Sequence, residues 1–195
     1  MKRYNNPLLI RMRLIAVVLF SSISIVGFGQ TLTAARITLE GTSNIHDWEM
    51  KSDKASGNAS ISFGANNAIT ALNNLNFVLP VESLKSEHKA MDKNTYKAMN
   101  SEKYPTLSYT AQTSSVKATG SNSFQIIGHG KLTINGVTKN TDITANCVVN
   151  PDKSVTCTGS YKFKMSLFSV EPPSIMFGTI TVGDDLNVKF SVTYK

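Results

Sequence analysis

A strict alternation of apolar and polar residues on both sides of one tight turn constrains this chain more than any other feature. The dipeptide Asn135-Gly136 tolerates the positive φ angles of a two-residue hairpin. Residues at equal distances from this turn then face each other, and apolar or small partners meet throughout, which indicates one consistent antiparallel register. The facing pairs are Ile134 with Val137, Gly128 with Ile143, Ile126 with Ala145, and Phe124 with Cys147.

A second turn at residues 151–153 extends this sheet by one strand. Counting outward from it, Val149 faces Val155 and Cys147 faces Cys157. Directly opposed cysteines in an antiparallel pair lie near the distance that a disulfide needs. We therefore predict a bridge that staples the hairpin, with two buried free thiols as the alternative.

The alternation continues over most of residues 35–195. Turn residues recur about every ten positions, a spacing typical of an antiparallel sandwich or a closed barrel, and we expect roughly eight or nine strands. Residues 183–185, Gly-Asp-Asp, predict a turn that folds residues 180–182 back on residues 186–194. The residues that share one side of a strand are Ile37 and Leu39; Trp48 and Met50; Ile61 and Phe63; Leu75, Phe77, Leu79 and Val81; and Leu186, Val188, Phe190, Val192 and Tyr194.

One segment, residues 83–105, has a helical period instead. Ser83 and Ser86 are candidate N-caps, and Pro105 prevents a helix from continuing. One or two short helices are therefore expected to interrupt the sheet. The residues that share the helical face are Leu84, His88, Met91, Thr95 and Met99.

Residues 1–29 have the three parts of a secretory signal peptide. A basic start precedes the apolar residues 14–26, and Gly27 and Gly29 supply the small residues before a cleavage site at Gln30. A retained membrane anchor is the alternative, but the apolar run is short for a spanning helix, which needs about 20 residues. We therefore expect residues 30–195 to form one exported domain that is not an integral membrane protein.

Removal of this leader lowers the net charge. The whole chain has a formal charge of +7. The leader holds four of the basic residues and none of the acidic ones. Sixteen basic and thirteen acidic residues therefore remain, and the charge falls to +3. The one remaining arginine is Arg36 and the lysines are scattered. Nothing resembles the basic stripe that follows a phosphate backbone, so nucleic acid is not expected as a partner.

Residues that could carry catalysis are sparse. His46, His88 and His129 lie far apart in sequence without metal-ligand spacing, and no nucleophile-elbow, zinc-protease or phosphate-loop motif is present. Inside the sheet, only His129, Tyr161 and Thr141 are candidates for a polar site. The sequence therefore predicts neither an enzyme nor a metal site.

Small residues gather on the inner face of residues 124–165, where Gly128, Gly130, Ala145 and Gly159 lie between larger side chains. A barrel of about eight strands can hold a small ligand instead of filling its interior. Small residues would leave room for one, or the glycines relieve strain where the sheet bends, and both explanations stay open. Adaptable apolar lining, or ordinary core packing, is expected of Met91, Met99, Met165 and Met176.

Three segments that occur in this order carry a resemblance to a known family: LPVESLKSE at residues 79–87, MDKNTYKAMNSEKYPTLSY at 91–109 and GKLTINGVTK at 130–139. With them the chain resembles the YceI-like family of bacterial periplasmic and secreted lipid-binding proteins. The resemblance covers nearly all of residues 30–195. It implies a lipocalin-like antiparallel barrel with the helical insertion beside its open end, whose lumen can hold a long polyisoprenoid or a chain like that of an isoprenoid quinone.

The resemblance also implies a ligand-contacting wall but no catalytic set. Before and along the insertion, the implied wall residues are Phe77, Leu79, Leu84, Met91, Tyr96 and Met99. The inner face deduced from the hairpin register adds Ile126, Leu132, Ile134, Tyr161 and Phe163.

The leading hypothesis is a non-catalytic carrier for an amphiphilic isoprenoid lipid or quinone, located in the periplasm or secreted and with no other cofactor. The alternative is an envelope interaction or stress-response module with a filled barrel and no ligand. A third hypothesis, an enzyme of isoprenoid metabolism, would use the polar candidates named above. A homodimer is a further possibility.

Overall fold

The computed structural model describes residues 29–175 and 177–195. The predicted leader falls almost entirely on residues 1–28, and Met176 of the predicted lining is also outside the described residues. Within the described ranges, no helix is both long enough and apolar enough to cross a membrane.

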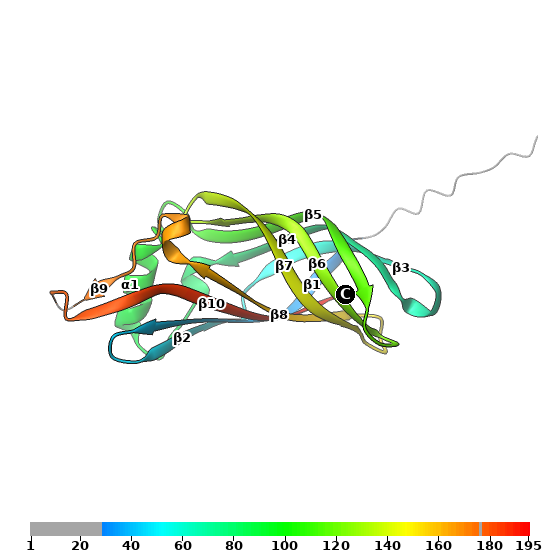
Figure 1. Cartoon of the computed structure of the whole chain (residues 1–195), viewed down its shortest axis with the longest axis horizontal. Helices are drawn as coiled ribbons and strands as arrows, with labels where there is room; N and C mark the ends of the chain where they lie inside the picture. Colours follow the sequence, from blue (N-terminus) through cyan, green and yellow to red (C-terminus); the bar gives the residue numbers. More distant parts are fainter. Residues whose placement is uncertain (1–28, 176) are drawn as a thin grey trace, which may run out of the picture.

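Eight antiparallel strands close into a barrel, and two short strands lengthen its wall at one end (Figure 1). Around the barrel the order is β1-β3-β4-β5-β6-β7-β8-β10, and β10 pairs with β1 to close the ring. The barrel prediction is confirmed and the sandwich is not. The strands are β1 (Gln30–Ser43), β2 (Asp47–Ser52), β3 (Ser56–Phe63), β4 (Ile69–Pro80), β5 (Thr106–Ala118), β6 (Ser123–Ile134), β7 (Val137–Val149), β8 (Val155–Lys164), β9 (Ser174–Ile175) and β10 (Ile180–Tyr194).

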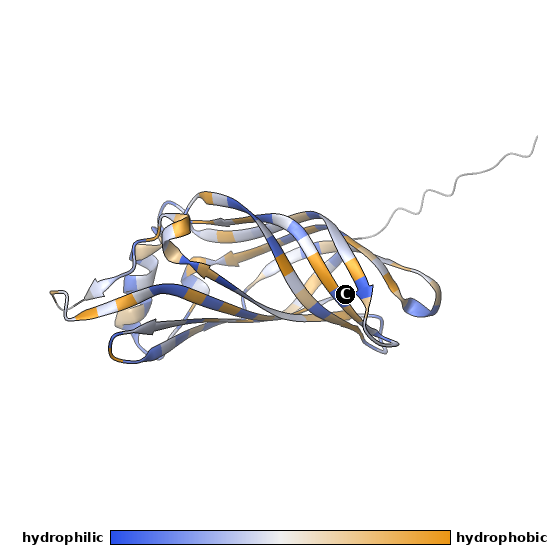
Figure 2. Cartoon of the chain, viewed as in Figure 1, coloured by the Kyte–Doolittle hydropathy of each residue, from blue (hydrophilic) through white to orange (hydrophobic). Residues whose placement is uncertain are grey.

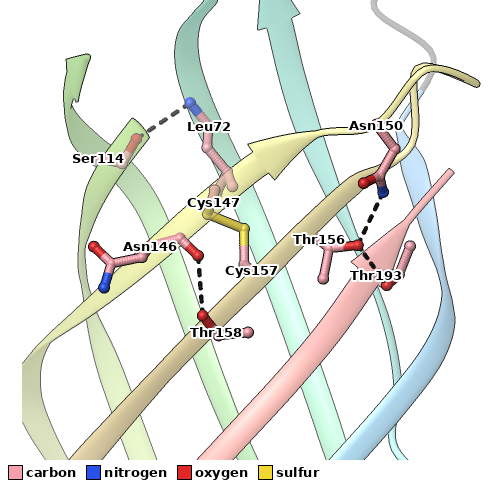
Figure 3. The surroundings of a disulfide bond; sticks show 9 residues. All are labelled: Leu72, Ser114, Asn146, Cys147, Asn150, Thr156, Cys157, Thr158 and Thr193. Atoms are coloured by element: carbon pink, nitrogen blue, oxygen red, sulfur yellow. Dashed lines mark hydrogen bonds between the residues drawn. A yellow bond between two sulfur atoms is a disulfide. The ribbon is translucent and has the colours of Figure 1, made fainter. Parts of the chain in front are cut away.

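Both hairpin registers read from the sequence are confirmed. β6 and β7 pair from Ile134 opposite Val137 onward, and Asn135 and Gly136 adopt φ angles of 50° and 73° in the turn. On the next strand pair Cys147 faces Cys157. The two cysteines form the predicted disulfide, which joins β7 to β8 (Figure 3). Their Cα atoms are 4.0 Å apart.

The alternation of hydropathy along each strand is visible in Figure 2. On β6, Phe124, Ile126, Leu132 and Ile134 point inward and are buried, while the residues between them, apart from the buried Gly128, are exposed or half-buried. A sheet of this pattern has one face for the interior and one for water, so closure into a barrel puts the apolar face inside.

The predicted turn at residues 183–185 is wrong. Residues 180–194 form one continuous strand, β10, whose early part pairs with β1 at Ser43 and with β8 at Lys164. The register along β1 shifts between Gly41 and Ser43, which marks a bulge rather than a reversal. Asp184 stabilises it by accepting hydrogen bonds from the Ser166 backbone N–H (2.8 Å) and hydroxyl (2.7 Å). Glycine and aspartate suit bulges as well as turns.

The helical insertion between β4 and β5 contains a 3-10 turn, η2 (Val81–Ser83), and one α-helix, α1 (Lys89–Ala98). The predicted N-caps are wrong, because the helix begins after His88, which makes no side-chain cap. Ser86 lies before the helix and binds its first turn from there. Its backbone N–H and its hydroxyl both donate to the buried carboxylate of Asp92, at 2.7 and 2.8 Å. Two further 3-10 turns are η1 (Ala65–Asn67) and η3 (Met165–Phe168).

Candidate functional site

A cavity of about 350 Å³ occupies the middle of the barrel. Leu75, Phe77, Ile143, Tyr161 and Val188 border it and point inward, yet all five are only half-buried. An inward side chain keeps accessible surface only where it meets open space rather than a packed neighbour. The lumen is therefore hollow, and its volume lies in the lower part of the range of about 300–1,000 Å³ that is usual for ligand pockets.

The cavity opens at the end of the barrel that carries α1. Ile45, His46 and His88 border the cavity and are exposed to solvent, so the mouth lies between the β1–β2 turn and the start of α1. At the other end the bordering residues, such as Cys147 and Cys157, are buried, which makes the cavity blind there.

The lining is almost wholly apolar. Among the described residues, no Lys, Arg, Asp or Glu side chain borders the cavity. An ionised group placed there would lose its hydration without a compensating partner. The few polar side chains of the lining include Ser43, His46, His88, Asn94 and Thr95, which come from the β1–β2 turn and from the segment around α1.

The structure brings together all of the predicted wall residues except Tyr96. The Tyr96 hydroxyl instead donates to the carbonyl oxygen of Leu84 at 2.7 Å and accepts from Lys85 Nζ at 2.7 Å. It therefore fastens α1 to the segment before it. A tyrosine hydroxyl that is removed from water usually finds a hydrogen-bond partner, and Tyr96 finds its partners in the segment before α1.

The small residues of the inner face explain the hollow only in part. Gly128 and Ala145 border the cavity. The space over Gly130 is filled by the ring of Tyr109, and that over Gly159 by the ring of Phe190. At Gly159 an added Cβ would lie 2.5 Å from the Phe190 ring and 2.6 Å from a backbone oxygen of β7. At these two glycines the prediction of empty space is wrong.

Several lining residues were missed in the sequence. They include Leu75, Leu107 and Ile143, and, on β10, Leu186, Val188 and Phe190. The signal for β10 was available, because the alternation over residues 186–194 assigns these side chains to one face. Which faces meet the hollow part of the lumen depends on the closure of the barrel, which alternation alone does not reveal.

One buried tyrosine connects the lining to the wall. Tyr109 borders the cavity, and its hydroxyl donates to the carbonyl oxygen of Gly128 at 2.6 Å. Burial raises the pKa of this phenol to about 12, so that it remains a neutral donor at physiological pH. Burial also raises the pKa of Tyr194, at the blind end.

The strongest catalytic geometry lies outside the lumen. His129 Nε2 is 2.9 Å from the Ser115 hydroxyl, and His129 Nδ1 is 3.1 Å from Asp142 Oδ2. These are the contacts of a serine nucleophile and its base. All three side chains are exposed on β5, β6 and β7, however, and none of them borders the cavity. Efficient acyl transfer also needs a substrate pocket and oxyanion donors.

Within the described residues, no three His, Cys, Asp or Glu side chains are grouped as metal ligands would be. His46 and His88 lie at the mouth, and His129 lies on the outer face of the sheet. What the interior offers is a long apolar surface with a polar entrance, which suits an amphiphile.

Solved structures share this architecture. BcnA of Burkholderia cenocepacia matches over 83% of this chain and 96% of its own length, with 18% identity and a TM-score of 0.61. A polyisoprenoid binding domain from Saccharophagus degradans, implicated in plant cell wall breakdown, matches over 85% and 97%, with 12% identity and a TM-score of 0.67. The YceI protein of Campylobacter jejuni matches over 70% and 80%, with 20% identity and a TM-score of 0.50.

At these identities the structural likeness shows the fold. No curated protein matches the sequence. The pattern of the YceI-like domain, however, matches residues 23–194, which is most of the chain. The protein with the hollow barrel described above therefore belongs to the YceI-like family.

Proposed function

We propose that the protein is a non-catalytic carrier that holds an amphiphilic polyisoprenoid, or an isoprenoid quinone, in the barrel lumen. The observation that carries this proposal is the apolar cavity, open at one end and blind at the other. A single entrance suits a ligand with one long tail, which enters first, and one polar head, which stays at the mouth. The predicted wall residues other than Tyr96 contact the tail.

Burial of the tail supplies the affinity. Each methylene removed from water contributes about 0.8 kcal/mol, and part of this is offset by the ordering of a flexible chain. At the mouth, His46, His88 and Asn94 offer hydrogen bonds to the head group. Since no Lys or Arg of the described residues joins them, an uncharged head such as a quinone is favoured over a phosphate.

Two observations support this choice over the filled-barrel alternative. A filled barrel has a dry, packed lumen, whereas here inward residues such as Tyr161 and Val188 keep accessible surface. In addition, a solved structure of the same fold is described as a polyisoprenoid binding domain. The exposed site around His129 supports no enzyme that acts on a ligand in the lumen.

The disulfide between Cys147 and Cys157 supports export, because such bonds persist in oxidising compartments. We propose that residues 1–29 are removed as a signal peptide and that the carrier works in the periplasm or outside the cell. The role of the protein there would be to transfer the bound lipid between membranes, without changing it chemically.

Trp48 provides a direct test. It is the only tryptophan of the chain and borders the cavity at the mouth. We expect quinones with one to several isoprene units to quench its fluorescence, with an affinity that rises with each added unit until the lumen is full. The control ligand is the same quinone without a tail, which should bind far more weakly. Equal affinity for the tailed and the tailless quinone would contradict the proposal.

A further inference from the structure

Two large apolar side chains project into solvent at the mouth. Ile45, in the β1–β2 turn, is 57% exposed, and Phe177, in the β9–β10 turn, is fully exposed. Asn44 joins these turns: its side-chain amide donates to Thr179 O (2.9 Å) and accepts from Thr181 N (3.0 Å). The two turns are thus one unit, and we call Ile45 and Phe177 the apolar tips.

The segments that bear the apolar tips are uncharged. Residues 41–46 and 172–183 contain no Asp, Glu, Lys or Arg. They can therefore enter a less polar medium without desolvating an ion, which is the main cost of such a transfer. Single exposed apolar residues are common on soluble proteins, but these two project from joined turns at the end where the cavity opens, and Ile45 itself borders the cavity.

A basic stripe lies at the same end of the barrel. Lys89, Lys93 and Lys97 follow one another at intervals of one helical turn along α1, and all three are exposed. Within the described part of the chain, none of them forms a salt bridge, although several other lysines do. Figure 1 shows α1, β9 and the β1–β2 turn together at one end, with the β3–β4 turn at the other.

Apolar tips and a row of lysines at the same end of the barrel fit the surface of an anionic bilayer, where apolar side chains enter the interface and lysines contact lipid head groups. We propose that the mouth end docks on such a bilayer. Ile45 and Phe177 would enter the interface, and Lys89, Lys93 and Lys97 would contact the head groups. The docking rests on the surface residues; its purpose, lipid exchange without passage through water, rests on the proposed carrier function.

Flotation of the mature chain with vesicles tests the docking. One set of vesicles contains phosphatidylcholine alone, and the other contains phosphatidylcholine and phosphatidylglycerol in equal parts. The substitution Phe177→Asn removes an apolar tip while keeping a residue that tolerates the φ of 56° found there. We expect it to weaken binding to the anionic vesicles about tenfold, and the triple change K89Q, K93Q, K97Q to abolish the preference for them.

A matched control exists at the opposite end. Phe63 is also exposed, by 38%, but it lies at the end of β3, away from the mouth. Phe63→Asn should bind vesicles as the parent does. Equal losses in Phe63→Asn and Phe177→Asn, or no flotation of the parent with either set of vesicles, would overturn the docking.

The outcomes separate docking from carriage. Quinone delivered from cyclodextrin should still quench Trp48 in Phe177→Asn, because Phe177 does not border the cavity. A parent protein that takes up quinone but never floats with vesicles would refute docking and leave the carrier function intact. A parent protein that floats but takes up no quinone would refute the carrier function and leave docking intact. A concentration-dependent dimer that is lost in Phe177→Asn, with no flotation of the parent, would show that a second copy covers the tips instead.

Discussion

The two ends of this barrel are built from the same alternating strands, yet they differ in what fills them. Around the Cys147–Cys157 disulfide the interior is packed: Phe124, Val149 and Val155 are buried and do not border the cavity. Toward α1 the inward side chains stand apart around open space. Alternation decides which side chains point inward, whereas their size and the cross-links decide whether the interior is solid.

The difference assigns separate tasks to the two ends. The packed end joins β7, β8 and β10, where Thr156 also shares a hydrogen bond with Thr193 (Figure 3). The open end has turns, a short helix and the two short strands β2 and β9. Stability should therefore depend mainly on the packed end and ligand binding on the open one.

Loss of the disulfide is expected to have the largest effect on stability. The cysteines are 10 residues apart, and bridges of this kind typically contribute about 2–4 kcal/mol. We expect Cys147→Ala combined with Cys157→Ala to lower the free energy of unfolding by that amount in urea titrations, while tailed quinones still quench Trp48. Loss of quenching in protein that is still folded would break the division between the two ends.

Filling the open part of the lumen should weaken ligand binding rather than lower stability. Ala145 points inward beside the cavity, so Ala145→Phe places a ring in the tail path. Displacement of three or four methylenes, at about 0.8 kcal/mol each, predicts binding weaker by about a hundredfold. Thr144→Phe, on the exposed side of the same strand, is the control and should bind as the parent does. Quinone titrations that do not distinguish the two variants would contradict the assignment.

Tyr109 fastens β5 to the neighbouring strand β6, and its loss should have a moderate effect. Tyr109→Phe removes a buried hydrogen bond to β6 and is expected to cost about 1–2 kcal/mol. The pKa of this phenol is raised from about 10 to about 12 in the fold. The unfolded chain therefore ionises first, and stability that is full below pH 10 falls as the pH rises toward 12.

Tyr109→Phe should make that alkaline loss smaller without abolishing it, because the pKa of Tyr194 is raised as well. Unfolding titrations at neutral and alkaline pH measure both effects. An identical pH dependence in the variant and the parent would show that Tyr109 does not stay protonated in the fold.

The smallest effect is expected on the outer surface of the barrel. Ser115, His129 and Asp142 have the contacts of a catalytic relay but no connection to the cavity. We expect Ser115→Ala to leave both quinone binding and the slow background hydrolysis of p-nitrophenyl acetate unchanged. A parent that hydrolyses this ester clearly faster than Ser115→Ala would reveal an activity that the carrier account lacks.

The sequence predicted most of the wall because hairpin registers are local. The Asn135-Gly136 turn determines the partners on β6 and β7, and the next turn determines the cysteine pair. The error at residues 183–185 arose because Gly and Asp also suit a bulge. The ring of Tyr109 lies over a glycine of the paired strand β6, and that of Phe190 over a glycine of the paired strand β8, so both depend on strand registers that these two hairpin turns do not determine. Tyr96 depends on carbonyl groups of the insertion. None of these is readable from periodicity.

Native mass spectrometry of the mature protein, exported by a bacterial host and purified without detergent, can detect a lipid in the lumen directly. The carrier account predicts one isoprenoid lipid per chain in the parent and in Thr144→Phe, and none in Ala145→Phe. A parent that carries no lipid, and that still gains no mass after incubation with a long-tailed quinone, would contradict it.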